Sequence, residues 1–173
     1  MSDAAEQILV AIERWMADSP RPLVVAIDGP GAAGKTTIAA DVAWIFEAMV
    51  VHTDDYLHEA EDNGDPRPMA HYYSWPALRE EALEPAIGWL REQPASSSVA
   101  QLILVEGVSS AAPALADLVS RAVFVETPVQ LRLERLHARI SDEEWDEEWL
   151  YAERLYFASR PPDSFDLVVS GSD

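Results

Sequence analysis

Short continuous apolar runs alternate along the chain with longer stretches in which apolar residues recur every three or four positions. The short runs are typical of strands buried on both faces of a parallel sheet, and the longer periodicity is typical of amphipathic helices. Strands separated by helices predict an α/β fold, with a five-stranded, mostly parallel sheet and helices on both faces. The predicted strands are residues 23–27, 49–52, 102–105, 123–125 and 166–169, and the predicted helices are residues 4–17, 35–47, 75–91, 113–121, 129–140 and 142–159.

The length and charge of the chain narrow the classes of protein to which it can belong. Its 173 residues predict one domain over residues 1–173. A formal net charge of −19 repels nucleic acid and anionic membranes, so we expect neither as a partner. The acidic N-terminus and the absence of a long apolar run predict a cytoplasmic protein, which we expect to be a monomer or a homodimer. No cysteine is present, which excludes disulfides and thiolate chemistry.

The turn after the first predicted strand carries the strongest chemical signal. Residues 29–36 match the pattern G-x-x-x-x-G-K-[ST], between a buried strand and an amphipathic helix. This pattern is typical of a phosphate-binding loop and predicts the P-loop NTPase fold, with ATP and Mg²⁺ as ligands. Lys35 would reach the β- and γ-phosphates, and the Thr36 hydroxyl would bind Mg²⁺. The predicted nucleotide-binding residues are Gly29, Gly31, Ala32, Ala33, Gly34, Lys35, Thr36 and Thr37.

The basic residues restrict the kind of P-loop protein. Of the 12 basic residues, 11 are arginine, and Lys35 is the only lysine. Lysine carries a compact ammonium group and arginine a planar guanidinium, so the two are not interchangeable at a tight site. The single lysine indicates that position 35 has a steric and chemical requirement for the ammonium group. A GTPase motif of the form Asn-Lys-x-Asp is excluded because the lysine is already used. The third strand ends in Glu106-Gly107 and not in the Asp-Glu of ATPases, which leaves a small phosphotransferase.

Acidic residues follow the second and third predicted strands. Asp54 and Asp55 come after the second strand, and Glu106 after the third. The carboxyl ends of parallel strands meet at one edge of the sheet, where ligands bind. Phosphoryl transfer to a hydroxyl needs a carboxylate that accepts the proton and acidic groups that hold the metal. The alternatives are a solvated loop for the aspartates and a turn acid for Glu106.

Four segments in this order resemble the uridine kinase-like P-loop kinases, a group that includes nicotinamide riboside kinase and is related to pantothenate kinase and phosphoribulokinase. They are DGPGAAGKTT at 28–37, TDDY at 53–56, LVEG at 104–107 and FVETP at 124–128. The resemblance implies that Asp54 is the base and a metal neighbour, that Glu106 lies at the metal and the substrate, and that Tyr56 lines the acceptor pocket. The chain is shorter than typical uridine kinases, and residues 65–73 match the nucleoside-recognition segment only loosely.

Three arginines occupy one face of the helix that follows the fourth strand. Arg132, Arg135 and Arg139 are spaced i, i+3 and i+7. We predict a lid over residues 132–148 in which Arg135 and Arg139 hold phosphates and assist catalysis. The alternative is a solvated face that pairs with acids such as Glu134.

Aromatic residues occur near the predicted acceptor site and along the last helix. His71 and Tyr72 are predicted substrate contacts, with a surface or packing role as the alternative for His71. Trp145, Trp149, Ala152 and Tyr156 recur at helical spacing, which is more typical of core than of a base-stacking surface.

The sequence therefore predicts an ATP-dependent kinase that phosphorylates a hydroxyl group of a small molecule, with a nucleoside as the preferred acceptor. Two alternatives stay open. The acceptor could be nicotinamide riboside, pantothenate or an antibiotic hydroxyl. The chain could also be a nucleotide-binding regulatory protein without transfer activity, although Lys35, Thr36, Asp54 and Glu106 are all present.

Overall fold

A parallel sheet forms the middle layer of the protein in a computed structural model that describes residues 1–18, 21–58, 68–94, 97–138 and 147–172. Within these residues the sheet has five strands in the order β2-β3-β1-β4-β5, and every neighbouring pair is parallel. The predicted α/β fold is therefore confirmed, with a sheet that is parallel throughout. The strands are β1 (Leu23–Asp28), β2 (Met49–His52), β3 (Leu102–Glu106), β4 (Arg121–Glu126) and β5 (Leu167–Ser170).

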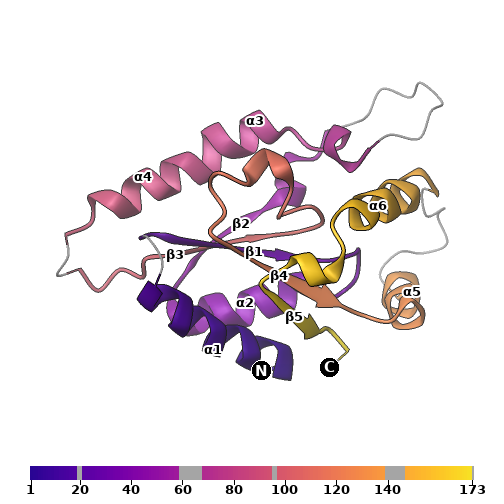
Figure 1. Ribbon diagram of the computed structural model, residues 1–173, viewed down its shortest axis with the longest axis horizontal. Helices are drawn as coiled ribbons and strands as arrows, with labels where there is room; N and C mark the ends of the chain where they lie inside the picture. The colour runs from indigo at the N-terminus through magenta and orange to yellow at the C-terminus, as the bar shows by residue number, and fades with distance from the viewer. Residues whose placement is uncertain (19–20, 59–67, 95–96, 139–146, 173) are drawn as a thin grey trace.

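Helices cover both faces of this sheet, as predicted (Figure 1). Helices α1 and α2 pack on one face, and α3 and α4 lie on the other. Helices α5 and α6 lie beyond the carboxyl ends of the central strands. No helix in the described ranges is long and apolar enough to cross a membrane. The helices are α1 (Asp3–Asp18), α2 (Lys35–Phe46), α3 (Trp75–Ala77), α4 (Glu84–Glu92), α5 (Val129–His137) and α6 (Glu147–Ser159).

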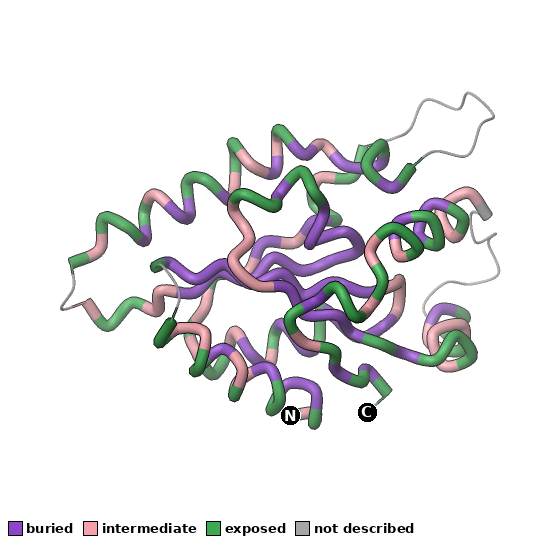
Figure 2. The backbone as a smooth tube through the Cα atoms, viewed as in Figure 1, coloured by how far each residue is buried: buried purple, intermediate pink, exposed green. Residues whose placement is uncertain are grey.

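The core lies on both faces of the sheet because successive side chains of a strand point to opposite faces. Val25 and Ile27 of β1 pack with the cluster under α1 and α2, whereas Val24 packs with the cluster under α3 and α4. Every residue of β1 and β3 is buried, which explains why these strands appear in the sequence as continuous apolar runs. Figure 2 shows this buried central layer between helices whose outer faces are exposed.

Two segments differ locally from the prediction. The helix predicted over residues 113–121 is only a 3₁₀ turn at Pro113–Leu115, and β4 already begins at Arg121. The chain must extend here because the Ser120 N–H donates to the carbonyl of Val24 in β1. The predicted helix at 75–91 is continuous but widens into a π-helical stretch at Leu78–Leu83, just before Pro85, which has no N–H to donate.

Candidate active site

The side chain of Asp28 binds the start of the glycine-rich loop between β1 and α2. The Gly29 N–H donates to the buried Asp28 carboxylate over 2.7 Å. Gly29 has a φ of +145°, and a Cβ there would lie 2.6 Å from the Val125 carbonyl oxygen. Only glycine therefore fits this turn. In this conformation Gly29 shapes the loop, and its amide is not available to a phosphate.

The start of α2 offers the amide groups to which an anion can bind. Gly34 precedes the helix in a left-handed conformation and provides no side-chain cap. The first N–H groups of a helix have no partner within it and carry its partial positive charge. They belong to Lys35, Thr36 and Thr37. The Gly31 N–H, in contrast, already donates to the Glu153 carboxylate of α6 over 2.6 Å.

Lys35 is the cation of this loop. Its side chain is almost covered, with 7% of the residue exposed, and its Nζ donates to the Pro30 carbonyl over 2.9 Å. Burial lowers the pKa of Lys35, and the carboxylates of Asp28 and Glu106 oppose that shift. The surrounding acids thus help to keep a positive charge at the position where a polyphosphate would need it.

A cavity of about 240 Å³ is lined by the predicted nucleotide-binding residues other than Gly29, together with Asp54 and Glu106. One side is the phosphate loop, and the acids Asp54 and Glu106 come from the ends of two other strands. Four apolar side chains also line the cavity, so its lining combines charged and hydrophobic groups. Its lining consists of Gly31, Ala32, Ala33, Gly34, Lys35, Thr36, Thr37, Asp54, Glu106 and Gly107, with Leu57, Val108, Leu136 and Trp149 as the apolar wall.

Glu106 contacts both the phosphate loop and the end of β2. Its carboxylate oxygens are 3.2 and 3.3 Å from the Thr36 hydroxyl, and its Oε1 is 2.6 Å from Nδ1 of His52. The next residue, Gly107, has a φ of +139°, and a Cβ there would overlap the Thr53 hydroxyl. A glycine after Glu106 is thus needed so that the chain can pass Thr53 while the carboxylate faces the loop.

The donors around Thr36 suit Mg²⁺ in their chemistry. The described residues contain no group of three or more His, Cys, Asp or Glu side chains that could hold a metal ion by themselves. Mg²⁺, however, is usually bound by one or two carboxylates together with substrate phosphates and waters. The hydroxyl of Thr36 and the carboxylate of Glu106 fit that mode, and Asp54 lines the same cavity.

The aspartate pair lies on a 3₁₀ turn at Thr53–Tyr56, directly after β2. Asp54 lines the cavity, and Asp55 is not among the described residues of its lining. Partial burial raises the pKa of Asp54, although the residue still reaches solvent. Lys35 opposes the rise, and the negative charges of Glu106 and Asp55 add to it. A carboxylate with a raised pKa is a better proton acceptor.

The three residues predicted to contact the acceptor are placed differently. Tyr56 is partly buried and packs against the core, and the following residue, Leu57, lines the cavity instead. His71 is exposed, and it is not among the described residues of the lining. Tyr72 is buried behind the cavity, where its ring meets Trp149 edge-on at 5.3 Å. Tyr72 therefore packs against Trp149, which lines the cavity.

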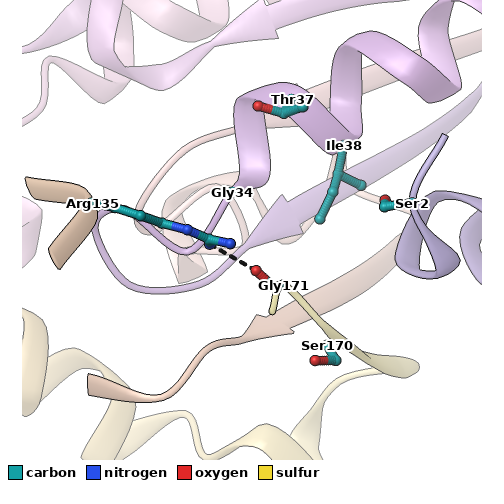
Figure 3. A pocket seen from close by; sticks show the side chains of 7 residues that line it. All are labelled: Ser2, Gly34, Thr37, Ile38, Arg135, Ser170 and Gly171. Atoms are coloured by element: carbon teal, nitrogen blue, oxygen red, sulfur yellow. Dashed lines mark hydrogen bonds between the residues drawn. The ribbon is translucent and has the colours of Figure 1, made fainter. Parts of the chain in front are cut away.

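A second pocket, of about 170 Å³, lies at the α2 N-terminus and shares Gly34 and Thr37 with the first (Figure 3). Arg135 of α5 extends across it and donates to the Gly171 carbonyl over 2.7 Å. The same guanidinium lies 3.5 Å from the carbonyls of Ala32 and Ala33 in the phosphate loop. Arg139, the other predicted lid arginine, lies outside the described residues. The pocket is lined by Ser2, Gly34, Thr37, Ile38, Arg135, Ser170 and Gly171.

Comparisons with known proteins place this geometry in a known architecture. No family model matches the sequence, and no curated protein matches it. Solved structures do match. A possible uridine kinase from Bacillus stearothermophilus has a TM-score of 0.67 and 17% identity, with 96% of this chain and 97% of that chain covered. A gluconokinase from Sinorhizobium meliloti has a TM-score of 0.54 and 14% identity, with 90% and 86% covered. A sugar kinase from Janibacter has a TM-score of 0.52 and 18% identity, with 88% and 86% covered.

The chain shares the fold of these kinase structures. The predicted fold class is confirmed over nearly the whole chain. At these low identities the likeness shows the architecture, whereas the roles of individual residues depend on the geometry of this chain.

In this fold, α6 contacts the phosphate loop through a carboxylate that the sequence analysis missed. Glu153 is only 3% exposed, and it accepts from the Gly31 N–H and from Arg132 of α5, at 3.2 Å. Arg132 also donates to the Gly31 carbonyl over 3.1 Å. Glu153 and Arg132 thus form hydrogen bonds with the backbone N–H and the carbonyl of Gly31, respectively. A charged residue three positions before Tyr156, on the apolar face of the helix, was the available signal.

Asp28 forms a second link between α6 and the loops. Its carboxylate accepts from the backbone N–H groups of Gly29, Ser109 and Ala111, and from the Tyr156 hydroxyl at 2.6 Å. Burial raises the pKa of Asp28, and the hydrogen bonds from Tyr156, Ala111 and Gly29 oppose the rise. Ala152 and Tyr156 are buried, as expected for core positions, and the Tyr156 hydroxyl also has a polar partner. Trp149 is only partly buried and lines the cavity, and Trp145 lies outside the described residues.

Proposed function

We propose that this protein is an ATP-dependent kinase that transfers the γ-phosphoryl group to a hydroxyl group of a small molecule. The observation that carries the proposal is the 240 Å³ cavity in which Lys35 and Thr36 of the phosphate loop meet Asp54 and Glu106 from two other strands. These are the kinds of group that phosphoryl transfer to a hydroxyl requires: a cation, a hydroxyl ligand for the metal, and carboxylates.

Each group has a distinct role in the proposed reaction. The acceptor oxygen bonds to the γ-phosphorus, the bond from that phosphorus to the β–γ bridging oxygen breaks, and ADP leaves with the bridging oxygen. Asp54 accepts the hydroxyl proton, a role that its raised pKa supports. Lys35 neutralises charge on the transferring phosphate. Thr36 and Glu106 would hold Mg²⁺, which offsets the negative charge of the phosphates.

The nucleoside part of the donor fits the pocket of Figure 3. This pocket shares Gly34 and Thr37 with the phosphate cavity, so a nucleotide can extend from one to the other around the start of α2. Arg135 offers a planar guanidinium for stacking and lies close to the loop carbonyls. The sequence analysis missed the residues that line this pocket, apart from Gly34, Thr37 and Arg135.

A nucleoside is the acceptor class that the cavity supports best. Its lining combines the apolar side chains of Leu57, Val108, Leu136 and Trp149 with the carboxylates, and the ring of Trp149 packs against that of Tyr72. A molecule with hydroxyl groups at one end and a flat base at the other matches this division. An open-chain polyol would leave the apolar wall without a partner, which makes it the less favoured alternative.

ADP release tests the proposal and separates the alternatives. The purified protein is incubated with ATP and each acceptor in turn, with and without Mg²⁺, and the acceptors are nucleosides, nicotinamide riboside, pantothenate, gluconate, fructose and hydroxyl-bearing antibiotics. We expect Mg²⁺-dependent release with a nucleoside, and none with Lys35→Met, which controls for contaminating kinases. Release with another acceptor alone would reassign the substrate. ATP binding without transfer to any acceptor would favour the regulatory alternative.

A further inference from the structure

His52 lies beside Glu106 because of the strand register. In the parallel pair β2–β3, His52 is the partner of Glu106, and both are the last residues of their strands. The imidazole Nδ1 is 2.6 Å from Glu106 Oε1. The Glu106 side chain is 6% exposed and that of His52 is 43% exposed. A half-exposed ring thus contacts a carboxylate that is almost completely covered.

The direction of this hydrogen bond follows from its acceptor. An ionised carboxylate can only accept, so Nδ1 of His52 carries the proton. The same carboxylate also accepts from the Thr36 hydroxyl, which lies 3.2 and 3.3 Å from its two oxygens. Glu106 is therefore held between His52 on one side and the phosphate loop on the other. A glutamate without the His52 contact would have further rotamers open to it.

His52 does not belong to the cavity wall itself. The described residues that line the cavity include Glu106, Thr36 and Asp54, and His52 is not among them. Any effect of His52 on the proposed reaction must therefore pass through Glu106. Partners of this kind, which orient a metal-binding carboxylate without touching the metal, affect metal affinity strongly.

We propose that His52 is a positioning residue that orients the Glu106 carboxylate toward Thr36 and thereby sets the affinity for Mg²⁺ in the nucleotide complex. This inference rests on the proposed function, because it assigns Glu106 to the metal site. It predicts that a donor at the Nδ1 position is required, and that the imidazole itself is not.

Two substitutions separate the donor from the ring. Asn has its amide nitrogen at the same number of bonds from Cβ as Nδ1, so His52→Asn keeps an N–H near Glu106. His52→Leu has a similar branched shape at this position but no donor. Because His52 is half-exposed, neither change opens a cavity in the core. Thermal unfolding of both variants checks that the fold is retained.

The experiment is calorimetric binding of ADP with and without Mg²⁺. For His52→Leu we expect the Mg²⁺-dependent gain in ADP affinity to fall by roughly 10–100-fold, the range typical for loss of such a partner. For His52→Asn we expect a change of less than about threefold, and the metal-free ADP affinity of both variants should match the wild type.

Three outcomes overturn the inference. In the first, His52→Leu keeps the full Mg²⁺ effect while the wild type shows one, which refutes the inference and leaves the proposed function intact. In the second, His52→Asn is as impaired as His52→Leu, which shows that the ring and not the donor matters. In the third, the wild type binds ADP without any Mg²⁺ effect, which removes the proposed metal site and this inference with it.

Discussion

Tyr156→Phe tests whether α6 is fixed to the phosphate loop through the buried carboxylate of Asp28. The change removes only the hydroxyl that donates to Asp28 Oδ2 at 2.6 Å, and the ring keeps its edge-on contact with Phe157 at 4.9 Å. Burial and the neighbouring Asp28 raise the pKa of Tyr156, so its hydroxyl stays protonated and donates. The lost interaction is therefore one hydrogen bond to a buried, charged acceptor.

The expected cost follows from that acceptor. A hydrogen bond to a charged group contributes about 1.5–3 kcal/mol to the free energy of unfolding. Asp28 keeps three backbone donors, so the carboxylate is not left without partners, and we expect a loss within this range. A chain of this size loses about 2–4 °C in Tm per kcal/mol, which gives a decrease of roughly 3–12 °C.

The assay is urea unfolding followed by circular dichroism, with Tyr151→Phe as the matched control. Tyr151 lies on the same helix but is 40% exposed, so its change should stay within about 0.5 kcal/mol. A Tyr156→Phe protein as stable as the Tyr151→Phe control would refute the reasoning, because the Asp28 contact would then contribute nothing.

The pH dependence of the unfolding free energy provides a second test of the Tyr156–Asp28 contact, and its direction can be predicted. Burial raises the pKa of Asp28 above its ordinary value, so this residue favours the folded state at low pH and loses that contribution as pH rises through its folded pKa. The Tyr156 bond favours the ionised form and works against that shift. The difference in unfolding free energy between Tyr156→Phe and the wild type should therefore shrink as pH falls and Asp28 becomes protonated. A difference that grew on acidification would contradict this assignment.

Four further predictions concern the proposed reaction. Lys35→Met should abolish transfer with an unchanged circular dichroism spectrum, and Lys35→Arg should lose most of kcat because the covered site of Lys35 does not suit a planar guanidinium; near-normal turnover of the arginine variant would exclude this requirement. Asp54→Asn should lower kcat by about 10²–10⁴-fold with little change in ADP affinity, and Asp55→Asn should be milder; the reverse order would move the base by one residue. Because the pKa of Asp54 is raised, wild-type kcat should increase with pH as this base loses its proton, whereas a kcat that fell with rising pH there would argue against a carboxylate base. Arg135→Ala should weaken ADP binding by roughly 2–30-fold in calorimetry, the equivalent of one guanidinium stacked on an aromatic ring, and unchanged binding would remove Arg135 from the nucleotide site.

The sequence alone determined the features that depend on neighbouring residues. Strands buried on both faces give continuous apolar runs, so the apolar pattern by itself was enough to locate β1 and β3. The phosphate loop was equally clear, because its turn, its lysine and the helix that follows lie within residues 29–37. The α/β pattern then predicted that Asp54 and Glu106 lie at the same edge of the sheet, since the strands of a parallel sheet all end on one side.

The tertiary structure decided which side chains from distant parts of the chain meet. His52 contacts Glu106 because strands 54 residues apart pair in one register, and a shift of one residue would have separated them. Glu153 reaches Gly31 across 122 residues, and Tyr156 reaches Asp28 across 128. Helical periodicity identifies the inward face of α6, but it does not specify what that face will contact. That depends on where the helix packs against the sheet, which is a property of the whole fold and not of the local sequence.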